Sequence, residues 1–294
     1  MPVSPDCILC LCRQSLDAAR FVSDDPMIHE KVLRRSLQLA LDRGFLDTPP
    51  LLGQEIHRDI RELTQNSDPY QSVKKLFNDL VYSQINTLKS RILTSPNPIE
   101  AALRIAIGGN AIDFALGATN LTPEFALTAI DKALAQPITG NAEKFLEILP
   151  KAKKILYLLD NCGEIVCDRL FIEEIKRQYS SEITAVVRGF PVINDATILD
   201  AQDVGLTDVC SVITNGNDGL GTILEKCSEE FHERLKEADL VIAKGLANYE
   251  TLIEYGPDKF PNTVAYLFKS KCAFIAKLSS STLGDLVVQF VERQ

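Results

Sequence analysis

Asp160 and Asn161 lie side by side directly after the apolar run 155–159 (ILYLL). A carboxylate and an amide oxygen placed together suit a hard divalent cation, which prefers oxygen ligands. Asp195 follows another apolar segment and supplies a further oxygen. The three histidines of the chain lie outside these segments, which argues against a zinc site of His and Cys ligands. We therefore predict a site for Mg²⁺ or Mn²⁺ built on these oxygens.

Two lysines and a glycine complete the predicted chemistry. Lys244 directly follows an apolar segment and precedes Gly245, and Lys271 follows another such segment. Ammonium groups and backbone amides hold phosphoryl oxygens, while a divalent cation neutralises their charge and orients the nucleophile. The alternative is that the Asp-Asn pair only caps the following helix, where such residues are favoured. Several polar residues are expected at the same edge, which favours a metal site over a helix cap. A metal ion beside lysines in turn favours the hydrolysis of a phosphate ester.

The segment GGNAID (108–113) places two polar residues inside an otherwise apolar helical pattern. Asn110 and Asp113 are three residues apart and therefore share one face of a helix. Buried polar groups need hydrogen-bond partners. The pair either bonds within the core or reaches over the strand edge into the predicted site, and the sequence leaves both open.

A parallel sheet would bring these residues together. After residue 150, short continuous apolar segments rich in Val and Ile alternate with amphipathic stretches, which is typical of parallel strands covered on both faces by helices. Ligands bind at the carboxyl edge of such sheets, near the point where the strand order reverses. The segments that we expect to be strands are 153–160, 182–189, 208–214, 238–245 and 263–268.

The first 150 residues carry helical patterns and no segment of strand character. Apolar residues recur at helical spacing in 32–44, 71–93 and 99–116. We predict a helical amino-terminal region over residues 1–150, followed by a Rossmann-like, three-layer α/β domain over 151–294 that carries the metal site. No linker rich in Gly or Ser separates the two parts, so we expect them to pack together.

The charge of the chain limits its partners. A formal net charge of -9 argues against a nucleic acid or an anionic membrane as a partner. The sequence has no run of about 18 apolar residues, which argues against a membrane-spanning helix, and its amino terminus does not resemble a signal peptide. We expect a cytoplasmic protein. The sequence leaves its oligomeric state open, including a homo-oligomer.

The amino-terminal segment CILCLC (7–12) contains a Cys-x-x-Cys pair, Cys7 and Cys10. Such pairs serve thiolate metal sites and redox chemistry. A structural zinc site usually needs a second pair, and none follows in this chain. The alternative is that these cysteines are thiols that pack a helix, and the sequence leaves the choice open.

Together these residues resemble the metal-dependent damage-control phosphatases, a family long catalogued as a domain of unknown function that also includes the acidic-residue methyltransferase-like proteins. The Cys-x-x-Cys pair resembles the mark of the stand-alone microbial subgroup. The residues that carry the resemblance are Asn110 to Asp113, Asp160-Asn161 with Gly163-Glu164, Asn194-Asp195, Lys244 to Glu250, and Lys271-Cys272.

The resemblance implies a helical amino-terminal part, a Rossmann-like part, and removal of phosphate from sugar phosphates and other phosphometabolites with Mg²⁺, Mn²⁺, Co²⁺ or Ni²⁺. It implies that Asp160, Asn161 and Asp195 bind the metal and carry the catalysis. The residues expected to contact the small phosphorylated substrate are Asn110, Asp113, Glu164, Lys244, Gly245, Asn248, Tyr249 and Lys271.

One motif departs from the family pattern, and two other functions stay open. In the eukaryotic subgroup the lysine belongs to Arg-Thr-x-Lys, whereas residues 268–271 here read Phe-Lys-Ser-Lys, so the arginine is absent. One alternative is a carboxyl methyltransferase that uses S-adenosylmethionine, although the loop after residue 159 lacks the several glycines of a nucleotide-binding turn. The other is a protein that binds phosphometabolites without turning them over. Whether water or Asp160 attacks the phosphorus is also open.

Overall fold

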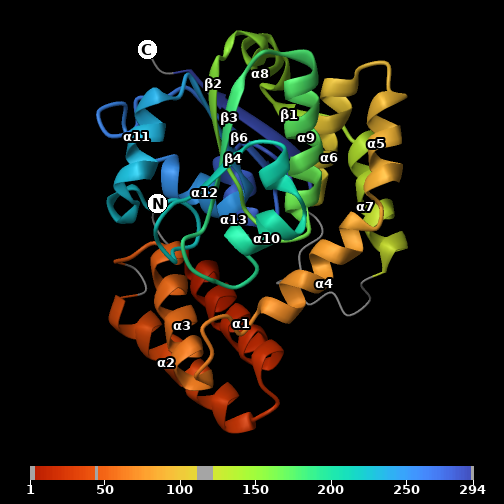
Figure 1. Cartoon of the computed structure of the whole chain (residues 1–294). Coiled ribbons are helices and arrows are strands. Elements are labelled where there is room, and N and C mark those ends of the chain that lie inside the picture. Colours follow the sequence, from red (N-terminus) through yellow and green to blue (C-terminus); the bar gives the residue numbers. More distant parts are fainter. Residues whose placement is uncertain (1–3, 44–45, 111–121, 293–294) are drawn as a thin grey trace.

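The computed structural model describes residues 4–43, 46–110 and 122–292 (Figure 1). Its first three helices form a unit at one end of the molecule (Figure 1). They are α1 (Pro5–Val22), α2 (Pro26–Arg43) and α3 (Pro49–Thr64). We call this unit the helical cap. It encloses a hydrophobic cluster of its own, whose buried members include Leu11, Leu39, Ile56, Ile60 and Tyr70.

The next four helices pack mainly against one another and against the helix Glu164–Gln178, and the third of them also contacts the sheet. They are α4 (Gln71–Tyr82), α5 (Ile85–Leu93), α6 (Pro98–Gly109) and α7 (Pro123–Ala135). The pattern over 71–93, which predicts one helix, is divided between α4 and α5 at a turn over residues 83–84. No helix in the three described ranges is long and apolar enough to cross a membrane.

Within the described residues, a seven-stranded sheet has the order β1-β7-β6-β5-β2-β3-β4. Neighbouring strands are parallel except β6 and β7, which are antiparallel. The strands are β1 (Ile138–Gly140), β2 (Lys154–Leu158), β3 (Glu182–Val187), β4 (Ser211–Thr214), β5 (Leu240–Lys244), β6 (Val264–Lys269) and β7 (Leu286–Val291). The other helices are α8 (Ala142–Ile148), α9 (Glu164–Gln178), α10 (Ile198–Asp203), α11 (Glu229–Glu237), α12 (Gly245–Leu252) and α13 (Ala273–Leu278).

Helices cover both faces of the sheet, as the alternating side chains of β2 show. Ile155 and Tyr157 belong to a hydrophobic cluster that includes residues of α6, α8 and α9. Leu156 and Leu158 point to the other face and join a second cluster with residues of α11, α12 and α13. A strand that is buried on both faces requires a continuous apolar sequence. The predicted three-layer α/β class is therefore confirmed.

The structure adds two strands that the sequence patterns do not predict. β1 has only three residues and precedes residue 150, too short to produce a period. β7 is an apolar run interrupted by Gln289, and it pairs antiparallel with β6, so the sheet is mixed rather than wholly parallel. Because the hydrophobic clusters group α4 to α7 with the sheet, the division at residue 150 stays a prediction that the packing does not require.

The strand order places the ends of β2 and β5 at the switch point of the sheet. From β2 the chain moves outward to β3 and β4, and then returns to β5 on the other side of β2. The connections that follow β2 and β5 therefore leave the carboxyl edge in opposite directions, and such a point is where open parallel sheets bind ligands. Asp160 follows the first of these strands and Gly245 the second.

A buried aspartate attaches the helical cap to this carboxyl edge. Asp218 lies in the loop after β4, and its Oδ1 accepts a hydrogen bond of 2.6 Å from Nε2 of Gln54 on α3. Its Oδ2 accepts one of 2.8 Å from Nε of Arg58, and Arg61 donates to the same oxygen. Burial raises the pKa of Asp218, but these donors outweigh it and hold that pKa well below its ordinary value.

Replacing Asp218 by Asn should therefore lower the free energy of unfolding by about 2 kcal/mol at neutral pH, because two guanidinium groups lose their carboxylate. A group with a depressed native pKa stabilises above its unfolded pKa of about 4 and loses that contribution below it. The difference between the wild type and D218N should accordingly shrink in urea titrations between about pH 5 and pH 2. The control is D79N, which removes an exposed pair with Lys75 and should cost less than about 0.5 kcal/mol. Equal losses for the two variants would contradict the role of Asp218.

Candidate functional site

The loops after β2 and β3 are joined directly. Asn161 and Asp195 form an isolated antiparallel bridge, and the backbone N–H of Ala196 donates to the carbonyl of Asp160 at 2.8 Å. These backbone bonds bring Asp160, Asn161 and Asp195 together at the carboxyl edge. All three side chains are buried, with 5%, 7% and 2% of their surface exposed.

The hydrogen bonds of these side chains determine which carboxylate oxygens are already paired with donors. Nδ2 of Asn161 donates to Oδ2 of Asp160 at 2.9 Å, so the Oδ1 of this amide takes no part in that bond. Nδ2 of Asn110 approaches the same Oδ2 of Asp160 at 3.3 Å. Nε of Arg188 donates to Oδ2 of Asp195 at 2.6 Å, and its Nη2 lies 3.7 Å from Oδ1 of Asp160. The two amides therefore hold one oxygen of Asp160, and the other oxygen faces Arg188.

The electrostatics of this cluster favour a cation. Burial raises the pKa of Asp160 well above its ordinary value, and the carboxylates of Asp195 and Glu164 raise it further. Arg188 and Lys271 act in the opposite direction. Two crowded carboxylates and an amide oxygen are a donor set that fits an oxygen-liganded divalent metal. In the part of the chain that the structure describes, no three His, Cys, Asp or Glu side chains are placed to hold a metal, so such a site depends on the amide of Asn161.

Gly245 is the first residue of α12 and lies against Asp160. Its φ is +75°, and a Cβ atom at this position would lie 1.8 Å from Oδ2 of Asp160. Only glycine combines this positive φ with so close an approach. The glycine therefore allows the end of β5 to reach the carboxylate after β2.

Lys244, the last residue of β5, is fully buried beneath this glycine. Its Nζ donates to the carbonyl of Ala106 at 2.9 Å, to Oε1 of Glu164 at 2.7 Å and to Oδ1 of Asp168 at 2.5 Å. Burial lowers the pKa of Lys244, but the two carboxylates outweigh it and raise that pKa above its ordinary value. An ammonium group has three donors, and all three are used. The prediction that Lys244 contacts substrate stays untested, and its position favours a supporting role.

Glu164 connects that lysine to the candidate metal cluster. Its Oε2 accepts a hydrogen bond of 2.6 Å from Nδ2 of Asn110, the residue that also approaches Asp160. Glu164 and Asn110 are 0% and 1% exposed. Asn110 caps the end of α6 and its Oδ1 accepts from the backbone N–H of Lys269 at 3.4 Å. Asp113, predicted to share its face, lies outside the described residues.

Asn248 and Tyr249 lie on α12 and are buried. Nδ2 of Asn248 donates to the carbonyls of Leu159 and Lys244, at 3.1 and 2.8 Å, and its Oδ1 accepts from the hydroxyl of Thr222 at 2.8 Å. The hydroxyl of Tyr249 donates to Oε1 of Gln289 at 2.9 Å. Both residues hold neighbouring loops and strands in place in this structure, and their predicted contact with substrate stays untested.

The charges of two lysines, Lys271 and Lys269, influence the cluster and its surroundings. Lys271 is half-buried and is among the cations that lower the pKa of Asp160. The pKa of Lys269 is lowered by burial and by the charges of Lys271 and Lys132. A group of ammonium ions that disfavour one another provides a favourable place for an anion.

Arg188 is a component of the cluster that the predicted site residues do not include. It follows β3 directly and is 1% exposed. A sequence signal could have identified it, because a cation next to a buried strand has to find a counter-charge. The same signal singles out Lys244. The partner of Arg188, Asp195, is itself a predicted ligand.

Cys7 and Cys10 lie one turn apart near the start of α1. Burial raises the pKa of both thiols, and Cys272 and Glu250 are among the neighbouring groups that raise them further. Raised pKa values favour protonated thiols over the thiolates that metal binding and redox chemistry use. The described residues around them include no group of three possible ligands that is placed to hold a metal.

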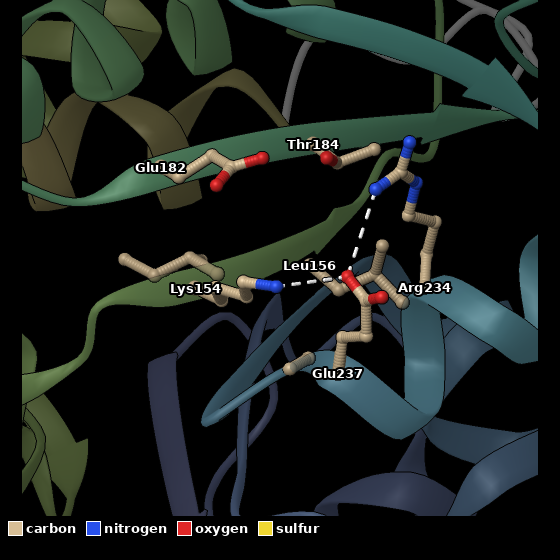
Figure 2. Close-up of a pocket in the computed structure, with 8 residues that line it drawn as sticks. Lys154, Leu156, Glu182, Thr184, Arg234 and Glu237 are labelled. Carbon is tan, nitrogen blue, oxygen red and sulfur yellow. Dashed lines mark hydrogen bonds and ion pairs between the residues drawn. The ribbon is translucent and has the colours of Figure 1, made fainter.

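Among the described residues, one hollow lies at the amino ends of the strands and a larger cleft lies at the carboxyl edge, where the cluster is. At the amino ends of β2 and β3, Lys154 and Arg234 both point to the carboxylate of Glu237 (Figure 2), at 3.0 and 3.6 Å. This hollow measures about 10 Å³, about the size of one water.

A cleft of about 480 Å³ lies between α3 and the loop after β3, on the carboxyl side, and is lined by Arg58, Arg61 and Phe190 among others. Its size suits a small molecule.

Replacing Lys244 by Met should lower the free energy of unfolding by about 3–5 kcal/mol, because two buried carboxylates lose their counter-cation. The loss should be smaller near about pH 5 than near pH 8, because Asp168, whose pKa burial raises to about 7, is protonated at the lower pH. Urea unfolding at both pH values measures it. K154M removes the exposed pair with Glu237 and should cost less than about 0.5 kcal/mol. A cost for K244M no greater than for this control would refute the assignment.

Replacing Gly245 by Ala should weaken Mn²⁺ binding at least about tenfold, because the added methyl group displaces the Asp160 carboxylate and adds backbone strain. The matched control is G256A, where a Cβ meets nothing within 4 Å and Mn²⁺ affinity should stay unchanged. Titration calorimetry with Mn²⁺ compares the two variants. Wild-type affinity in G245A would show that Asp160 does not need its observed position to bind the ion.

Comparisons with known proteins identify the family to which the chain belongs. The family model described as the damage-control phosphatase ARMT1-like domain matches residues 3–287. A protein called damage-control phosphatase from Archaeoglobus fulgidus is 32% identical over 99% of this chain and 100% of its own length. An uncharacterized protein of Methanocaldococcus jannaschii is 35% identical over 97% of this chain and 94% of its own.

A solved structure shows the same fold. The crystal structure of a DUF89 family protein from Pyrococcus horikoshii matches with a TM-score of 0.88 and 28% identity, over 99% of this chain and 100% of that one. A damage-control phosphatase of that organism is 28% identical over 98% of this chain and 97% of its own. The resemblance drawn from the residue motifs is therefore confirmed, and with it, at the level of the family, the expected phosphatase class. The chain belongs to the damage-control phosphatase ARMT1-like family.

Proposed function

We propose that this protein is a metal-dependent phosphatase that hydrolyses phosphomonoesters of small metabolites, such as sugar phosphates or damaged phosphometabolites. Mg²⁺, Mn²⁺, Co²⁺ or Ni²⁺ would be held by Asp160, Asn161 and Asp195. The observation that carries the proposal is the placement of two buried carboxylates and an amide oxygen, from the loops of two adjacent strands, at the switch point of the sheet. Nη2 of Arg188 lies 3.7 Å from Oδ1 of Asp160, and the positive charge of Lys271 lowers the pKa of the same carboxyl group.

The side chains of the cluster divide the work between them. The bound cation would act as a Lewis acid that neutralises phosphoryl charge and orients the nucleophile. Asp160 orients that nucleophile, or attacks the phosphorus itself. Lys271 contributes positive charge to the phosphoryl oxygens. Asn110, held between Glu164 and Asp160, fixes the carboxylate in its orientation.

The substrate approaches from the side of the helical cap. The cleft lined by Arg58, Arg61 and Phe190 lies at the same edge as the carboxylates and is large enough for a sugar-sized group. The formal charge of -9 supports a small molecule rather than a nucleic acid as the partner. The phosphate would bind at the cluster, and the rest of the metabolite would point toward the cleft.

The proposal is tested by assaying phosphate release from a panel of sugar phosphates, with Mn²⁺, Co²⁺, Ni²⁺ or Mg²⁺ added in turn. Release should depend on the added metal and should fall at least about 10³-fold in D160A and D195A, since each removes a metal ligand. The control is D239N, because Asp239 accepts from the backbone of residues 153 and 154 at the opposite edge of the sheet. D239N should retain wild-type turnover.

Three outcomes separate the alternatives. Metal-dependent release that D160A abolishes supports the phosphatase. Heat of binding for a sugar phosphate, without phosphate release under any of the four metals, would instead identify a binding protein. Equal release by D160A and the wild type would exclude the proposed site.

A further inference from the structure

Arg188 is fixed in the cluster by its backbone before its side chain is considered. It directly follows β3, and its N–H donates to the carbonyl of Ala196 at 2.9 Å. It also forms an isolated parallel bridge with Thr197. The segment that carries Asp195 therefore holds the backbone of Arg188 in place. Its guanidinium group is placed by the fold rather than by a mobile loop end.

The guanidinium group of Arg188 uses only part of its hydrogen-bonding capacity. Nε donates to Oδ2 of Asp195 at 2.6 Å. Nη2 is buried and has no hydrogen-bond partner among the described residues. Oδ1 of Asp160 lies 3.7 Å from it, beyond hydrogen-bond length. Buried donors nearly always have partners, and leaving one unpaired destabilises the folded state.

The surroundings define what could pair with Nη2. Oδ2 of Asp160 is already held by the amides of Asn161 and Asn110. The remaining oxygen of Asp160 lies on the same side as Nη2 and belongs to the predicted metal site. An oxygen atom that is bound next to the metal would therefore lie within reach of this donor. Arginine is well suited to the non-bridging oxygens of a phosphoryl group, because its N–H donors have a fixed planar geometry.

We propose that Arg188 is a catalytic residue that donates a hydrogen bond from Nη2 to a non-bridging phosphoryl oxygen of the substrate. This inference rests on the proposed phosphatase function and adds a residue to its site. In the net reaction, the bond from phosphorus to the ester oxygen breaks, a bond from phosphorus to the oxygen of water forms, and a proton of that water passes to the alcohol that leaves. Arg188 remains protonated throughout and exchanges no proton. Its contribution is to stabilise negative charge on the phosphoryl oxygens.

A positioning role alone would not use the whole side chain. The bond from Nε is sufficient to orient Asp195. A residue that served only that purpose would not need a second buried donor pointing to Asp160. The two roles predict different behaviour once the metal is bound, because orienting Asp195 affects metal affinity and contact with a phosphoryl oxygen affects phosphate affinity.

The test uses the full-length protein, its R188M and R188K variants, and inorganic phosphate as the probe. Calorimetry first gives the Mn²⁺ affinity of each protein, and phosphate is then titrated at a Mn²⁺ concentration that saturates that protein. Phosphate affinity should fall about 10- to 100-fold in R188M and less in R188K, which retains the charge without the fork. The kcat for a sugar phosphate should fall about 10²- to 10³-fold in R188M.

The matched control is R169M. Arg169 is a partly buried arginine that pairs with Glu173 on α9 and donates to the carbonyl of Val204, outside the site. Phosphate affinity in R169M should equal that of the wild type. If R188M does not fold, the comparison of R188K with the wild type decides by the same criterion.

The inference would be overturned if metal-saturated R188M bound phosphate as tightly as the wild type does. If R188M does not fold, the same result for R188K would overturn it. Arg188 would then be only a positioning residue for Asp195. That result would not affect the proposed function, provided that the wild type still releases phosphate. A wild-type protein that binds Mn²⁺ but neither binds nor releases phosphate would overturn both proposals. A loss of phosphate affinity confined to the Arg188 variants supports the inference.

Discussion

The repulsion between two buried carboxylates governs the architecture of the carboxyl edge. Asp160 and Asp195 are almost inaccessible to solvent, and each raises the cost of charging the other. Such a pair is stable only if fixed cations and hydrogen-bond donors surround it. The residues around it meet this requirement in two ways, by donating to the carboxylate oxygens and by placing positive charge nearby. A divalent cation between the same oxygens would relieve the repulsion most directly.

The repulsion between the two carboxylates accounts for the residues at the end of β5 and directly after it. Gly245 is needed because any side chain there would collide with the Asp160 carboxylate. Lys244, one residue earlier, is buried where Glu164 and Asp168 balance its charge. Glu164 then holds Asn110 against Asp160. The strand order makes these contacts possible, because β2 and β5 are neighbours although Glu164 and Lys244 are 80 positions apart in the chain.

Much of this could be predicted from the sequence, because the relevant signals are local. Asp160, Asn161 and Asp195 each follow a continuous apolar segment, and the rule for parallel sheets then places them at one edge. The strand β1 could not be predicted in this way, because its three residues are too few to show a pattern of apolar positions. The run of β7 is as apolar as the other strands, but nothing in its pattern says that it returns antiparallel.

The roles of individual polar residues were harder to predict, because they depend on partners far away in the chain. Lys244 is the last residue of a strand, near where a phosphate-binding lysine could lie, yet its donors are taken by Ala106, Glu164 and Asp168. Arg188 directly follows a strand and does reach the cluster. The sequence shows both as cations after an apolar run. Only the three-dimensional positions of their partners distinguish them.

The most direct test is a crystal structure of the protein with Mn²⁺, using the anomalous scattering of manganese. The account predicts an anomalous peak coordinated by carboxylate oxygens of Asp160 and Asp195 and the amide oxygen of Asn161. A manganese ion bound elsewhere, with these three side chains directed away from one another, would contradict it.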